Sequence, residues 1–223
     1  MKRRDYVAEI LDKRSRLPSD SERWDIVARE LEVLLDEVDR ISSFLETQDR
    51  SYSELIAYVP IRAVTILEGY FHLVYASLVD YGDPYRANAS TFELRFSIDT
   101  ALSLERHSVT MGEFVSHLLT TNNLDDINYN MSKLMGGDFL AAVKAKYLSM
   151  ARQLYIWDEL EDRADAILLE SIASLYRKRH ILCHELAPPG VTSREADFFI
   201  DYTMRFIRAS ELVIADLTPR TGA

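Results

Sequence analysis

Apolar residues recur every three or four positions over long stretches of this chain, and this spacing constrains the fold more than any other feature. The clearest run consists of Trp24, Val27, Leu31, Leu34, Leu35, Val38, Ile41 and Leu45. A period of 3.6 residues places such side chains on one face of an α-helix, whereas the side chains of a strand alternate at every second residue. The run therefore predicts an amphipathic helix of roughly six to seven turns.

Four capping signals mark the expected starts of helices. Each places a Ser or Thr at the N-cap and a Glu three residues later, so that each side chain can bind the backbone N–H of the other residue. The four pairs are Ser19 with Glu22, Ser51 with Glu54, Thr110 with Glu113, and Thr192 with Glu195. The helix from Ser51 is expected to reach about Asp80, to be kinked or restarted by Pro60, and to be central because its apolar face is wide.

The middle third of the chain predicts shorter elements. Residues 92–98 alternate between apolar and polar, as a strand does, but no partner strand is evident, and we therefore predict a helix from Phe92 to Glu105. The other predicted helices cover residues 2–16, 110–120, 124–135, 139 towards 157, 161–186 and 192 onward. Seven Gly and six Pro are few for this length, which also favours long helices. Together these patterns predict an all-α protein, an antiparallel helical bundle of roughly five to eight helices.

Composition excludes several classes of protein. Hydrophobic residues make up 48% of the chain, which argues against disorder, and a lone Cys183 cannot form an internal disulfide. The most apolar segment, residues 55–79, is interrupted by Pro60, Arg62 and Glu68, so no membrane span is expected. The net charge of −10 disfavours an extended phosphate-binding face but permits a local basic site. We expect a soluble cytoplasmic protein that does not contact a membrane.

Residues 175–185 gather three cations, two histidines and the only cysteine at the end of one predicted helix. Motifs for a phosphate loop, a serine hydrolase or a zinc protease are missing from the sequence. His180 and His184 lie four residues apart on one helix face, but no third ligand is evident, so neither a metal nor another cofactor is expected. Cys183 points about 100° away from His184, and we interpret it as a small residue packed near the helix end.

The combination of Arg and His in this stretch suits cleavage of a phosphodiester without a metal. Histidine exchanges protons near neutral pH, and a guanidinium can hold a phosphate bidentately and stabilise its developing charge. RNA supplies its own nucleophile, the ribose 2′-OH. An alternative interpretation stays open, because basic residues in the last turns of a helix are also favoured by the helix dipole.

The pattern Arg179-His-Ile-Leu-Cys-His184 resembles the short motif of the ribonuclease members of the HEPN family (higher eukaryotes and prokaryotes nucleotide-binding). That motif has an Arg, commonly a polar residue next, and a His after four to six intervening residues. Its context is similar as well, because the segment 66–71 resembles the first core helix of the family and a proline break follows the motif. The resemblance covers roughly residues 51–217, with residues 1–50 as an N-terminal helical extension.

The resemblance implies a HEPN-like α-helical bundle that dimerises and cleaves RNA without a metal, commonly as a toxin or phage-defence effector with a possible antitoxin protein. It implies that Arg179 binds the scissile phosphate, that His184 is the general base or acid, and that His180 assists. Arg177 and the adjacent Lys178 are expected to contact the RNA substrate. The alternative function is a non-catalytic HEPN-like module that binds nucleotides or a protein.

The arginine of the motif is not uniquely assigned. Arg179 and His184 lie about 140° apart on an ideal helix, whereas Arg177 precedes His184 by seven residues and falls on nearly the same face. A second subunit could complete a site that one helix cannot form, which makes a homodimer part of the hypothesis.

Overall fold

The computed structural model describes residues 4–17, 22–47, 54–153 and 164–219. Every regular element in these ranges is an α-helix, so the predicted all-α class is confirmed. The helices are α1 (Tyr6–Ser15), α2 (Arg23–Thr47), α3 (Glu54–Ala57), α4 (Val59–Tyr81), α5 (Tyr85–Ala89), α6 (Ile98–Arg106), α7 (Met111–Leu118), α8 (Leu124–Met135), α9 (Phe139–Gln153), α10 (Ala164–His184) and α11 (Ser193–Leu217). Because short helices such as α3 and α5 are included, the described ranges contain more helices than the predicted five to eight.

Helix α4 is the centre of the fold, as predicted, and it contacts α2, α7, α8, α10 and α11. Tyr70, Phe71 and Tyr75 on this helix are fully buried. The ring of Phe71 meets those of Tyr70 and Phe139 edge to face, with centroid distances of 4.9 and 5.8 Å. Pro60 lies in the first turn of α4, where its missing N–H is not needed, and it therefore restarts the helix after α3 instead of kinking it.

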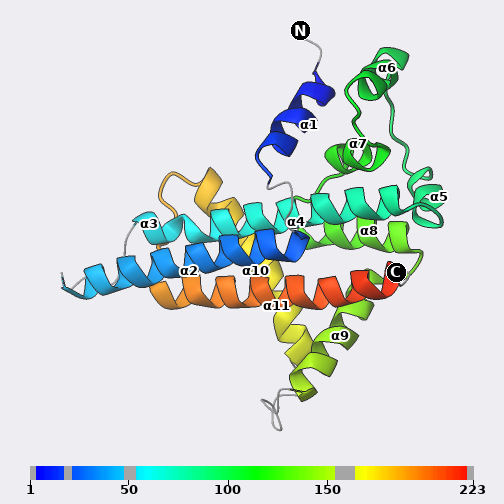
Figure 1. Ribbon diagram of the computed structural model, residues 1–223. Coiled ribbons are helices and arrows are strands. Elements are labelled where there is room, and N and C mark those ends of the chain that lie inside the picture. Colours follow the sequence, from blue (N-terminus) through cyan, green and yellow to red (C-terminus); the bar gives the residue numbers. More distant parts are fainter. Residues whose placement is uncertain (1–3, 18–21, 48–53, 154–163, 220–223) are drawn as a thin grey trace.

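The long helices form the body of the molecule (Figure 1). Helices α2, α4 and α11 contact one another and lie lengthwise side by side, with α2 running opposite to the other two. The predicted antiparallel packing thus describes α2 against its two neighbours, while α4 and α11 run in the same direction. Helix α10 crosses this layer, whereas α9 lies on one side of it and runs obliquely away from α11; both helices contact α11.

A second, smaller core lies beside the main one, where α1, α6 and α7 meet. It contains Val7, Ile10, Leu104, Val109 and Phe114. Helix α7 also packs tightly against α4, so this small core is attached to the central helix. The predicted N-terminal extension therefore contributes to both cores, because α2 packs into the main one and α1 into the smaller one. The domain boundary at residue 50 stays a prediction.

Capping signals located the helices well wherever they fall on described residues. Thr110 and Thr192 form complete capping boxes with Glu113 and Glu195. The signals at Ser19 and Ser51, and the predicted extension of α9 towards Trp157, lie outside the described residues.

The predicted helix from Phe92 to Glu105 is wrong in its first half. Helix α6 begins at Ile98, and the side chain of Ser97 caps it by accepting a hydrogen bond from the N–H of Thr100. The preceding residues form neither a helix nor a strand. Tertiary contacts explain this conformation, because Phe92 packs against the main core and lies 4.7 Å from the ammonium group of Lys133 on α8.

Candidate functional site

Helix α10 is anchored in the core by one face and presents the candidate residues on the other. Leu168, Ile172, Leu175 and Tyr176 are buried, and α10 contacts α4, α8, α9 and α11. The final residues, from Cys183 onward, are exposed. The end of α10 therefore projects beyond its packed portion, with its polar side chains accessible to a large substrate.

His180 and His184 lie together on the exposed face of α10. The centroids of their rings are 4.6 Å apart, with an angle of 47° between the ring planes. Their spacing of four residues places one ring above the other on the helix, and both residues are exposed. Two adjacent imidazoles can carry out opposite proton transfers on one substrate, since one can accept a proton while the other donates one.

Arg177 shares the exposed face with these histidines. Its guanidinium donates a hydrogen bond of 2.5 Å to the carboxylate of Glu170, and both side chains are largely exposed. Exposed ion pairs contribute little to stability, so an incoming phosphate can replace this carboxylate at small cost. Arg177 is thus available to a ligand that approaches the two histidines.

Arg179 lies differently, between α10 and the central helix. Its guanidinium is 3.7 Å from the carboxylate of Glu68 on α4, and its side chain is 30% exposed. Burial raises the pKa of Glu68, and the charge of Arg179 acts against that rise. The arginine of the motif is therefore already engaged with a half-buried carboxylate.

Lys178, a predicted RNA contact, holds the connection between α10 and α11. Its ammonium group donates a hydrogen bond of 3.1 Å to the carbonyl oxygen of Gly190 and lies 3.5 Å from the carboxylate of Glu195. The side chain is only 15% exposed. These contacts give Lys178 a structural role, and the predicted RNA contact stays untested.

The interpretation of Cys183 as a packed residue is wrong, because its side chain is exposed. It lies on the last turn of α10, after the buried part of the helix has ended, so no neighbouring element covers it. Sequence periodicity does not show at which residue a helix extends beyond the core that it packs against.

A second candidate site is a cavity of about 630 Å³ between α1, α2, α4 and α7, which sequence analysis missed. It contains His72 and His117, which lie on different helices and have no common motif. His72 is hydrogen-bonded between α4 and α7, because its Nδ1–H donates a hydrogen bond of 2.7 Å to the carbonyl oxygen of Ser116. No local pattern could reveal a cavity that four separate helices enclose.

His72 is expected to make the protein less stable in acid. Burial, and to a smaller degree the charge of Lys13, lowers its pKa to about 4 from the ordinary 6.5. The unfolded chain therefore binds a proton that the folded chain does not, and stability falls as the pH drops from 6.5 towards 4. From pH 7 to pH 5 this loss is about 2 kcal/mol by linkage. Urea unfolding at the two pH values should show a smaller loss for His72→Gln than for the wild type. His107 is exposed, so His107→Gln should lose as much stability between the two pH values as the wild type does. An equal loss of stability in all three proteins would contradict the lowered pKa of His72.

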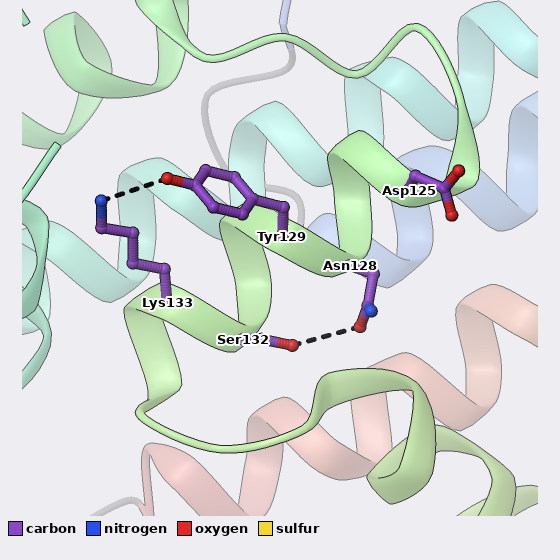
Figure 2. Close-up of a pocket in the computed structure, with 5 residues that line it drawn as sticks. All are labelled: Asp125, Asn128, Tyr129, Ser132 and Lys133. Carbon is purple, nitrogen blue, oxygen red and sulfur yellow. Dashed lines mark hydrogen bonds between the residues drawn. The ribbon is translucent and has the colours of Figure 1, made fainter. Parts of the chain in front are cut away.

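The surface of α8 carries a further hollow of about 570 Å³ (Figure 2). It is lined by Asp125, Asn128, Tyr129, Ser132 and Lys133. Figure 2 shows hydrogen bonds from Lys133 to the hydroxyl of Tyr129 and from Ser132 to Asn128, with distances of 3.3 and 3.1 Å. Lys133 also donates to the carbonyl oxygen of Thr91. Four of the five side chains are thus engaged within α8 and with the loop before α6, and this hollow is not a candidate site.

Among the residues that the structure describes, no group of three or more His, Cys, Asp or Glu side chains is arranged to hold a metal ion. None of the helices in the same ranges has the length and apolarity needed to cross a membrane.

Comparisons with family models, with curated proteins and with solved structures found no match to this chain. The resemblance to the HEPN family therefore rests on the motif of α10 and its sequence context.

Proposed function

We propose that this chain is a metal-independent endoribonuclease with a HEPN-like fold, whose site is the exposed end of α10. The observation that carries the proposal is the pair of exposed imidazoles, His180 and His184, with ring centroids 4.6 Å apart and Arg177 on the same helix face. The packing of α10 against α4, which contains the segment 66–71 of the resemblance, also supports it.

In the proposed reaction, His184 accepts the proton of the ribose 2′-OH while His180 donates a proton to the leaving 5′-oxygen. The 2′-oxygen forms a bond to phosphorus as the bond from phosphorus to the 5′-oxygen breaks. The products are a 2′,3′-cyclic phosphate and a free 5′-hydroxyl. Arg177 binds the non-bridging oxygens, where its two parallel N–H groups stabilise the charge that develops in the transition state.

A homodimer forms part of the proposal, as does a biological role as a toxin or phage-defence effector controlled by an antitoxin. Pairing two α10 ends would place a second set of imidazoles and guanidinium groups across one cleft, and would exclude water from the reacting phosphate. The net charge of −10 is compatible with this arrangement because the positive charge is concentrated locally.

The experiment that tests the proposal is incubation of purified protein with total RNA in EDTA. We expect fragments that end in a 2′,3′-cyclic phosphate, and no cleavage of the same sequence when its riboses carry a 2′-O-methyl group. Folded, dimeric protein that leaves RNA intact in EDTA would overturn the proposal.

The two arginines are expected to differ in their effects. Arg177→Ala should lower the cleavage rate by about 10²-fold, since it removes a donor to the transition state without touching the core. Arg179→Ala should mainly lower stability, by about 1 kcal/mol, because Glu68 is left half-buried without its cation. Initial rates and urea midpoints measure both effects. Loss of cleavage in Arg179→Ala alone would show that the motif arginine acts on the phosphate.

One observation favours the alternative, a non-catalytic module that binds a nucleotide or a protein. The motif arginine, Arg179, is ion-paired with Glu68 and turned from the histidines, as a structural residue would be. Expression in a bacterial host separates the two functions. A ribonuclease toxin should slow growth and His184→Ala should relieve this effect, whereas a binding module should leave growth unchanged.

A further inference from the structure

We propose that the cavity between α1, α2, α4 and α7 binds a small aromatic acid that also carries an N–H or O–H donor. The volume of about 630 Å³ is in the ordinary range for sites of small organic ligands. Three properties of the walls carry this assignment: an apolar lining, a ring nitrogen with a free lone pair and an excess of cations.

The apolar lining comes from α1, α2 and α4 and from Leu17, which follows α1. It consists of Ile10, Leu17, Ile26, Val27, Ile66, Leu73 and Ala76. Gly69 adds open space on α4, because a Cβ built there would meet no atom within 4 Å. A flat ring system fits such walls and removes their apolar surface from water.

The need for a donor comes from His72 on α4, which lines the cavity. Its Nδ1–H donates a hydrogen bond to the carbonyl oxygen of Ser116, which leaves Nε2 with a lone pair. His117 on α7 lines the cavity as well, but its Nε2–H donates to the carboxylate of Glu9 and its Nδ1 is enclosed by the protein. Polar atoms in protein interiors are almost always paired, so Nε2 of His72 indicates a ligand group that donates to it.

The need for an acid comes from the balance of charge around the cavity. Its lining contains Lys13, Arg14, Arg16, Arg29 and Arg62 against three carboxylates, Glu30, Glu68 and Glu113. This local excess of positive charge contrasts with the net charge of −10 for the whole chain. An acidic ligand is attracted to such a site.

Two of these cations are available to a ligand. Arg14 pairs with Glu113, Arg62 pairs with Glu30, and Arg16 pairs with Asp12, which lies outside the lining. Neither Lys13 nor Arg29 forms an ion pair with a carboxylate in the described part of the chain. Lys13 lines the same cavity as the rings of His72 and His117. Burial lowers the pKa of both rings, and the positive charge of Lys13 adds to that lowering. The carboxylate of the ligand is therefore placed against Lys13.

Binding at this cavity is separable from RNA cleavage. None of the exposed residues at the end of α10 lines it, and it approaches that helix only through Glu68, whose carboxylate is paired with Arg179. The inference therefore stands or fails independently of the proposed ribonuclease activity.

The test is calorimetric titration of the full chain with indole-3-acetate, which combines an aromatic ring system, one N–H and one carboxylate. Two related probes each lack one group: 1-naphthylacetate has no N–H, and 3-methylindole has no acid. We expect one site for indole-3-acetate and at least tenfold weaker binding of each related probe.

Protein variants locate that site. Lys13→Met should weaken binding of indole-3-acetate at least tenfold while leaving 3-methylindole unaffected, and His72→Phe should remove the preference over 1-naphthylacetate. The matched control is Lys144→Met, which removes a cation on α9 outside the cavity. Lys13 is exposed, so its variant is expected to fold even if His72→Phe does not. Equal binding of the three probes, no binding at millimolar concentration, or unchanged binding in Lys13→Met would overturn the inference.

Discussion

Replacing His184 with alanine is expected to lower RNA cleavage in EDTA by about 10²- to 10⁴-fold, the usual contribution of one general acid or base. His184 is exposed at the last position of α10, and its ring contacts that of His180. Truncation removes a proton acceptor without opening the core. The circular dichroism spectrum and the melting temperature should therefore match those of the wild type.

Two further variants sharpen this test. His107→Ala removes an exposed histidine at the end of α6, far along the chain from the proposed site, and should cleave as the wild type does. His180→Ala should lose a similar factor, and the double variant should lose little more, because groups that act as one unit are not additive. Full activity in folded His184→Ala would show that the catalytic site does not lie on α10.

Replacing Gly112 with alanine is expected to cost about 3 kcal/mol of stability, since overpacking against a backbone atom cannot relax by rotation of a side chain. A Cβ at this position would lie 2.2 Å from the carbonyl oxygen of Ala76 and 2.6 Å from the carboxylate of Asp80. Gly112 also donates its N–H to that carboxylate at 2.9 Å. The substitution would push α7 away from α4, and with it the wall of the cavity that contains His117.

Gly69 provides the matched control on α4. A Cβ there meets no atom within 4 Å, and alanine in a helix interior is favoured over glycine by up to about 1 kcal/mol. Gly69→Ala should therefore raise the urea midpoint, whereas Gly112→Ala should lower it. Equal midpoints for the two variants would contradict the close approach of α7 to α4.

Helical periodicity and the capping signals were sufficient to predict the secondary structure over most of the described residues. Thr110 and Thr192 cap α7 and α11 through bonds that span three residues, so the sequence around them contains the whole interaction. The central place of α4 followed from its wide apolar face. The close approach of the His180 and His184 rings on one helix face followed from their spacing of four residues.

Contacts between distant segments were not predictable in this way. Phe92 is not helical, because its side chain packs against the main core and lies under the ammonium group of Lys133. In the sequence, Arg179 fits the motif and Arg177 shares the helix face of His184, so the choice between them stayed open. In the structure α4 places Glu68 beside Arg179, whereas Arg177 pairs with the exposed Glu170.

The cavity around His117 depends on four helices whose separation along the chain hides any common motif. Local hydrogen bonds and periodicity act within a few residues, so the order of residues is enough to predict them. The partners of a side chain on the far side of a helix depend on packing, which is settled when the whole chain folds around α4.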